Sequence, residues 1–167
     1  MIFDAFESMV FYGAYHQNKV NKACHIVCVP LIWLTSISFM TLLPSEYPIH
    51  WIVYTVYCII YLTLEPLAMV LYAPIFHSIT LLGVHLTNYL SLSLITSLHL
   101  FGWIAQLYTH YAYEKRSPAL KDNIVQALLM APFFVWLEVL FIFNYRPHLQ
   151  QELQIHIAKR YSQFKKG

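Results

Sequence analysis

The sequence predicts an all-α, polytopic membrane protein: a helical bundle of about four spans, with an N-terminal amphipathic helix and a C-terminal re-entrant or interfacial helical hairpin. Of the 167 residues, 59% are hydrophobic and 11% are charged, whereas soluble domains average roughly 45–50% and about 25%. Moreover, residues 23–45, 47–64 and 66–113 contain no Asp, Glu, Lys or Arg. Charge-free apolar runs of this length are typical of membrane-spanning helices.

The elements follow from these runs. Residues 2–15 place apolar side chains along one stripe, which predicts an amphipathic helix at the membrane surface. Asn21 is a candidate N-cap for the helix that follows. Glu65-Pro66 predicts a helix end, because proline disfavours the helical conformation in the residue before it. The predicted spans are residues 25–43, 49–64, 67–84 and 90–111.

The basic residues predict the orientation. Loops 16–22 and 114–122 contain lysine or arginine, whereas loops 44–50 and 85–89 contain neither. Both ends of the four-span core are therefore expected on the cytosolic side. The formal net charge of +2 is too small to indicate a nucleic-acid partner.

The next apolar run, 123–144, conflicts with a fifth span, since crossing would place the basic residues of 145–167 outside. Ala131-Pro132 lies near the middle of the run and predicts a Pro-broken hairpin that returns to the cytosolic side. Residues 145–167 then form a polar cytosolic tail, and 1–167 form a single integral membrane domain. Glu138 is isolated in this apolar run, so it is expected either to be functional or to pair with a cation such as an arginine of the tail.

Three histidines are expected at one membrane depth. His16 and His25 flank the cytosolic start of the first predicted span, and His110 lies at the cytosolic end of the fourth. Glu114 follows His110 by four residues, on the same helical face. Two or three histidines with one carboxylate resemble the ligand set of non-haem Fe(II) oxygenases, and zinc suits the same ligands. The alternative is that these histidines are amphipathic side chains at the headgroup level. His99 lies too deep to share the metal unless its helix unwinds.

The segment from Glu114 to Asn123 carries much of the remaining polarity. It is either a solvated loop that sets topology or a carboxylate-binding rim, with Arg116 as a bidentate clamp and Lys115 as a point charge. Several amide side chains are expected near the same level, as a second layer around a metal or substrate; Asn21 and Asn123 are equally candidates for helix caps. These amides are Asn18, Asn21, Gln106, Asn123 and Gln126.

Several motifs resemble one family of small endoplasmic-reticulum proteins. They are Tyr15-His16 with Asn18, Asn21 and His25; Gly102-Trp103-x-x-Gln106 with His110; Glu114-Lys115-Arg116-x-Pro118-Ala119-Leu120-x-Asp122-Asn123-x-x-Gln126; and Ala131-Pro132-Phe133-Phe134. That family includes the fungal 2-hydroxy fatty acid dioxygenase of phytosphingosine breakdown. This chain departs from the family pattern at Leu107 and Thr109, where Phe and Gly are usual, and at Asn144, where Gly is common.

The resemblance implies an Fe(II)-dependent α-oxidation, in which a long-chain 2-hydroxy fatty acid and O2 yield the acid one carbon shorter plus formate. It implies that His16, His25 and His110 hold the iron. It also implies an endoplasmic-reticulum membrane location with the site on the cytosolic side, or the inner membrane if the source is bacterial. The alternative is a non-catalytic membrane scaffold or assembly protein of the same fold. Chain-length preference and oligomeric state do not follow from the sequence.

Overall fold

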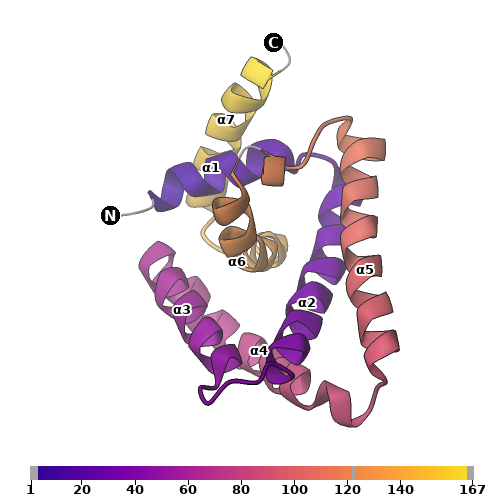
Figure 1. Cartoon of the computed structure of the whole chain (residues 1–167). Helices are drawn as coiled ribbons and strands as arrows, with labels where there is room; N and C mark the ends of the chain where they lie inside the picture. The colour runs from indigo at the N-terminus through magenta and orange to yellow at the C-terminus, as the bar shows by residue number, and fades with distance from the viewer. Residues whose placement is uncertain (1–3, 122, 165–167) are drawn as a thin grey trace. The chain divides into compact units, whose positions relative to one another are not determined.

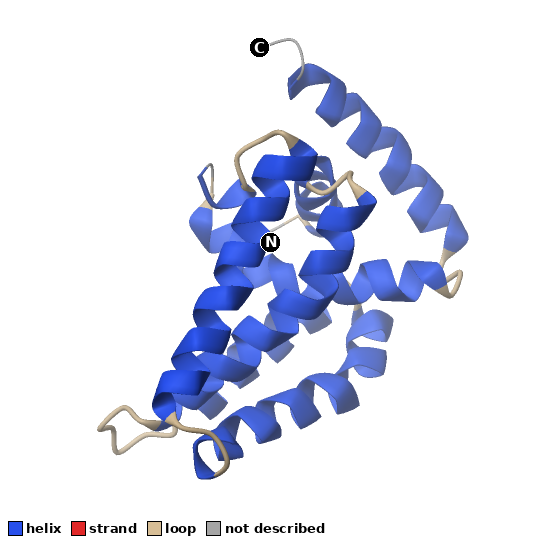
Figure 2. Cartoon of the chain, turned by 90° about the vertical axis from the view of Figure 1, so that its right-hand side faces the viewer, coloured by secondary structure: helices blue, strands red, loops and turns tan. Residues whose placement is uncertain are grey.

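The computed structural model describes residues 4–121 and 123–164, and within these ranges it consists of helices and loops without a strand (Figure 2). The predicted all-α class is confirmed. The α-helices are α1 (Ala5–Tyr15), α2 (Lys19–Thr41), α3 (Ile49–Leu64), α4 (Pro66–His85), α5 (Leu92–Thr109), α6 (Ile124–Ile142) and α7 (Pro147–Phe164). Short 3-10 segments form η1 (Leu86–Asn88) and η3 (Ala119–Lys121), and a π-helical segment forms η2 (His110–Glu114).

Among the described residues, three helices are long and apolar enough to cross a membrane: α2, α4 with η1, and α6. Helix α3 is apolar but shorter. The predicted spans 25–43, 49–64, 67–84 and 90–111 overlap α2, α3, α4 and α5. How many of these helices cross the bilayer stays a prediction.

The chain divides into two compact units. The central unit is formed by residues 27–106, and the terminal unit by residues 1–26 together with 107–167. The terminal unit thus combines the two ends of the chain. It contains the three histidines that the sequence singles out.

In the central unit, consecutive helices α3 and α4 pack against each other (Figure 1). Glu65 between them has an extended backbone, with φ −154° and ψ 92°, which confirms the helix end predicted at Glu65-Pro66. The core contains the Trp33 ring, whose centroid lies 4.7 Å from that of Phe76. The indole N–H of Trp33 donates to Thr80 Oγ1 at 3.0 Å, so this buried donor is satisfied.

Helices α2 and α5 approach closely within the central unit. A Cβ atom at Gly102 would lie 2.8 Å from Ile32 Cγ1, so only glycine fits there without a shift. Nearby, Trp103 Nε1 donates to His99 Nε2 at 3.0 Å. His99 Nδ1 must then carry the ring proton of the neutral imidazole, and it donates to Thr35 Oγ1 at 2.8 Å. His99 therefore links two helices.

In the terminal unit, α1 packs against both α6 and α7 (Figure 1). The helix predicted over 2–15 is observed as α1, which ends before His16, and its position at the membrane surface stays a prediction; residues 2 and 3 lie outside the described residues. The hairpin break predicted at Ala131-Pro132 is not observed, because α6 is one continuous helix with Pro132 inside it. Pro132 and its neighbours Phe133 and Phe134 are buried, and this packing offsets the hydrogen bond that proline cannot donate.

The chain turns after α6 rather than within it. Asn144 closes this turn with φ 60°, a left-handed conformation that glycine or asparagine adopts most readily. This conformation explains why glycine is common at position 144 in the family that the sequence resembles. The expected polar tail is helix α7 over most of its length, and residues 165–167 lie outside the described residues.

Replacing His99 by alanine should destabilise the central unit by about 2 kcal/mol, since it removes the acceptor of Trp103 and the donor to Thr35. Thermal unfolding of the detergent-solubilised protein measures the loss. The exposed His85→Ala serves as a matched control and should unfold like the wild type. A His99→Ala protein of unchanged stability would show that these two bonds contribute nothing.

Candidate metal centre

Three buried imidazoles converge in the terminal unit. His16 follows α1, His25 lies in α2 and His110 begins η2. Their side chains belong to residues that are 3%, 5% and 3% exposed, respectively. The ring centroids are 4.6 Å apart for His16 and His25, 4.8 Å for His16 and His110, and 5.0 Å for His25 and His110. The convergence that the sequence predicts for these residues is therefore observed.

The rings are oriented by backbone carbonyls. His16 Nδ1 lies 2.9 Å from the carbonyl oxygen of Tyr12, and His25 Nδ1 lies 2.9 Å from that of Asn21. Because a carbonyl oxygen only accepts, each Nδ1 carries the proton and each Nε2 keeps its lone pair. A backbone carbonyl on the far nitrogen is the usual arrangement for metal-binding histidines.

The donor set fits a metal ion. One ligand atom from each of the three histidines lies within 4.8 Å of the other two. His110 Nδ1 is buried and makes no hydrogen bond in the part of the chain that the structure describes. A buried nitrogen without a partner is costly, and a bound metal ion would remove this cost. The three residues are therefore suited to hold one divalent ion of the type that imidazole prefers, which includes iron and zinc.

Burial keeps the His16 imidazole neutral. The loss of water around the ring is the largest cause that lowers the pKa of His16 well below its usual value, followed by repulsion from His25 and His110. Neutral imidazole is the form that binds metal. At neutral pH, no proton has to leave His16 when a metal binds.

A π-helical segment positions His110. After α5 the backbone widens into η2, which ends at Lys115 with φ 55°. Single π-helical turns occur frequently at functional sites. The widened turn also changes the direction in which Glu114 points relative to His110, compared with a regular α-helix.

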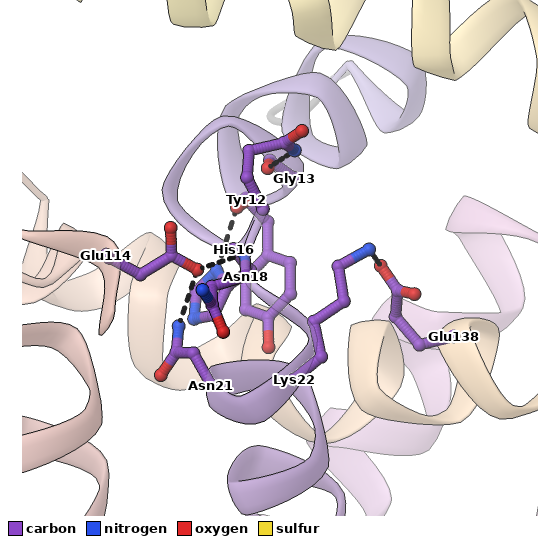
Figure 3. Close-up of polar contacts among 9 residues, drawn as sticks. Tyr12, Gly13, His16, Asn18, Asn21, Lys22, Glu114 and Glu138 are labelled. Atoms are coloured by element: carbon purple, nitrogen blue, oxygen red, sulfur yellow. Dashed lines mark hydrogen bonds and ion pairs between the residues drawn. The ribbon is translucent and has the colours of Figure 1, made fainter. Parts of the chain in front are cut away.

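Glu114 anchors η2 to the start of α2 (Figure 3). Its Oε1 accepts from the backbone N–H of Asn18 at 2.8 Å and from the Asn21 amide at 3.0 Å. Asn21 Oδ1 in turn accepts from Thr109 Oγ1 at 2.8 Å. Oε1 of Glu114 therefore supports the contact between η2 and α2, and a role of Glu114 as a metal ligand stays a prediction.

The prediction of Asn21 as a helix cap is wrong. Asn21 lies inside α2 and is fully buried, and Asn18 makes the local cap contact, accepting from Val20 N at 2.8 Å. Asn21 is instead a bridge between Glu114 and Thr109. The predicted cap at Asn123 is confirmed, since its side chain accepts from Gln126 N at 3.0 Å.

The other predicted residues are distributed around the site and beyond it. The Arg116 guanidinium carbon lies 4.2 Å from the centroid of the Tyr15 ring, next to His16 in sequence. Lys115 is exposed, and Gln126 donates to Ser8 Oγ at 3.2 Å. Gln106 belongs to the central unit, where its amide lies 3.4 Å from the carbonyl of Gly102.

Tyr12 is a site residue that sequence analysis missed. Its ring stacks on His16 with centroids 3.9 Å apart and on Phe134 with centroids 4.6 Å apart. Burial raises the pKa of Tyr12, with a further rise from the charge of Glu138, so its hydroxyl stays protonated. The available signal was the spacing of four residues, about one helical turn, between Tyr12 in α1 and His16 at the C-terminal cap of that helix.

Glu138 pairs with Lys22 at 2.7 Å (Figure 3). The partner is a cation, as expected, but it belongs to α2 rather than to the tail. The tail residue Arg160 contacts Glu7 instead, at 3.2 Å.

The sequence is similar to known proteins over most of its length. A family model described as "2-hydroxy-palmitic acid dioxygenase Mpo1-like" matches residues 3–143, which include all three histidines. The chain belongs to the Mpo1-like family. It is also 33% identical over 165 residues to the 2-hydroxy-palmitic acid dioxygenase MPO1 of Saccharomyces cerevisiae, covering 92% of this chain and 89% of that protein. No solved structure matches the chain.

Replacing His16, His25 or His110 by alanine should each lower metal affinity by more than about 100-fold, because even outer-shell changes cost 10–100-fold. Metal analysis of protein purified anaerobically in detergent measures this. His148→Ala, in the exposed part of α7, is the matched control and should keep its metal. Full metal content in all three variants would place the metal elsewhere.

Proposed function

We propose that this protein is an Fe(II)-dependent dioxygenase that shortens long-chain 2-hydroxy fatty acids by one carbon. The main support for the proposal is the convergence of His16, His25 and His110, with the Nε2 lone pairs of His16 and His25 available to a metal, in a chain of the Mpo1-like family. The named activity of the yeast relative supports the substrate class. The apolar helices support a lipid substrate that reaches the site from the bilayer.

Iron suits this site because three imidazoles leave coordination positions open for substrate and O2. Bound Fe(II) would supply activation of dioxygen and a point of attachment for the carboxylate and hydroxyl oxygens of a 2-hydroxy acid. An acid without the 2-hydroxyl group loses one of these two oxygens. The protein is therefore expected to discriminate against unhydroxylated fatty acids.

The chain's own residues would hold the substrate and the ligands in place. The Arg116 guanidinium suits a carboxylate, and its packing on Tyr15 keeps it beside the His16 segment. Glu114 and Asn21 keep η2 against α2, which maintains the distance between His110 and His25. Tyr12 fixes the His16 ring by stacking and by its carbonyl.

The balance of the reaction defines its one-carbon product. A 2-hydroxy acid and one O2 contain the atoms of the shortened acid, one CO2 and one H2O. The bond between C1 and C2 breaks, C2 becomes the new carboxyl carbon, and O2 accepts four electrons. Formate, which the resemblance implies, would require two further electrons from a reductant. We therefore expect CO2 when O2 is the only oxidant.

The decisive assay uses purified, Fe(II)-loaded protein with 2-hydroxyhexadecanoate labelled with carbon-13 at C1. We expect the acid one carbon shorter, with the label in CO2, and no turnover of unlabelled hexadecanoate offered in parallel. Mass spectrometry of the lipid and one-carbon products measures both. Folded, iron-loaded protein that converts no 2-hydroxy acid of any chain length would contradict the proposal and favour the non-catalytic scaffold.

We also propose that the protein resides in the endoplasmic-reticulum membrane, with the terminal unit on the cytosolic side. Gln126 and Glu138, which lie about 18 Å apart along α6, contact Ser8 of α1 and Lys22 of α2. These contacts support an α6 that lies alongside the surface helix α1 rather than crossing. A crossing α6 would also place the arginines and lysines of the α7 region on the outer side.

Single cysteines introduced at Lys19 and Ser162, in a variant without the native cysteines, test this topology. Both should react with a membrane-impermeant thiol reagent from the cytosolic side of sealed vesicles. Labelling of position 162 only from the luminal side, with position 19 cytosolic, would show that α6 crosses.

A further inference from the structure

The terminal unit contains a cavity of about 340 Å³ between α1, α6 and α7. Apolar and polar side chains both line it. The apolar ones are Met9, Phe134, Leu137, Phe141, Leu153 and Ile157, and the others are Tyr12, Gly13, Gln17, Lys22, Glu138, Gln150 and Gln154. Its volume lies within the range of about 300–1,000 Å³ that is usual for small-molecule sites.

The lining of this cavity suits an uncharged ligand. Its two ionic side chains, Lys22 and Glu138, pair with each other at 2.7 Å, so neither is free to pair with a charged ligand. The Gln17 amide is also engaged, donating to the carbonyl of Gly13 at 2.5 Å. A carboxylate placed here would lose water without gaining a partner, whereas a hydrocarbon chain would gain contact with the six apolar side chains, away from the polar part of the lining formed by Lys22, Glu138 and the glutamines.

The cavity adjoins the histidine cluster through Tyr12. The Tyr12 ring stacks on His16 and also lines the cavity. Gln17, another lining residue, follows His16 directly, and Lys22 precedes His25 by three residues. A ligand whose polar end reaches the imidazoles therefore has this cavity within the length of a short alkyl segment.

We infer that the cavity receives the acyl chain of the substrate, while its carboxylate and 2-hydroxyl group stay on the histidine side of Tyr12. The inference rests on the proposed function, because it takes the 2-hydroxy fatty acid as the ligand. Tyr12 is then the boundary between the polar and the apolar ends of the bound molecule. Carbons beyond C2 lie against the walls formed by α6 and α7.

Helix α7 closes the cavity and sets its length. Gln150, Leu153 and Gln154 contribute its α7 wall together with Ile157. A Cβ atom on Gly13 would lie 2.9 Å from Ile157 Cγ1, so the distance between α1 and α7 is set by direct contact at this point. Chain-length preference is therefore expected to depend on α7.

Two substitutions of Leu153, which is 3% exposed, should shift this preference in opposite directions. Leu153→Phe fills the cavity and should lower kcat/KM for a 16-carbon 2-hydroxy acid about tenfold relative to a 10-carbon one, as steric pockets commonly do. Leu153→Ala enlarges it and should shift preference toward longer chains. Ile155→Phe, on the exposed side of the same helix, is the matched control and should leave the ratio unchanged. Helical circular dichroism verifies folding, and Gln154→Phe at the cavity wall replaces Leu153→Phe if the latter does not fold.

A photocrosslinking experiment gives a readout independent of turnover. The probe is a 16-carbon 2-hydroxy acid with a diazirine near its terminal carbon, added to the full-length protein in detergent. Adducts on residues 134–141 or 150–157, reduced by excess unlabelled acid, would support the inference. Three results would overturn the inference. They are adducts only on residues 27–106, no adduct at all, and equal changes in kcat/KM for all chain lengths in the Leu153 variants. Wild-type turnover in the same samples tests the proposed function separately.

Discussion

The whole site depends on keeping three imidazoles neutral, buried and turned toward one point. Taking polar rings out of water is unfavourable unless each ring nitrogen has a partner. In two of the three rings, Nδ1 bonds to a backbone carbonyl four residues earlier, that of Tyr12 for His16 and that of Asn21 for His25. These two bonds determine which nitrogen has the lone pair, and so determine that the lone pairs are available to a metal. The third ring, His110, has a buried nitrogen that a metal would satisfy.

Much of the remaining structure of the terminal unit maintains that arrangement. The network of Glu114, Asn21 and Thr109 joins the end of α5 and η2 to the start of α2, so that His110 meets His25. Thr109 departs from the glycine usual in the resembling family, and its hydroxyl gives the buried Asn21 oxygen a donor. The stack of Phe134, Tyr12 and His16 connects α6 to His16. Asn21 thus supports two of the histidines, His25 through its carbonyl and His110 through Glu114 and Thr109, while Tyr12 supports His16.

The class of fold and the three histidines followed from the sequence because both depend on long-range composition. Charge-free runs define apolar helices, and the positions of basic residues place the ends of those helices at common depths. Local predictions fared less well where tertiary packing decides. Pro132 did not break α6, because its apolar neighbours are buried, and Asn21 did not cap α2, because its side chain is used by Glu114. Tyr12 was missed because its spacing of four residues from His16 does not by itself distinguish a stacked aromatic ring from an ordinary apolar residue of the helix.

The central claim is that His16, His25 and His110 together bind the iron. X-ray absorption spectroscopy at the iron edge, on anaerobically loaded protein in detergent, observes the ligands directly. We expect a first shell of nitrogen and oxygen with the multiple-scattering signature of about three imidazoles. A shell containing sulfur, or one with scattering from a single imidazole or none, would contradict it.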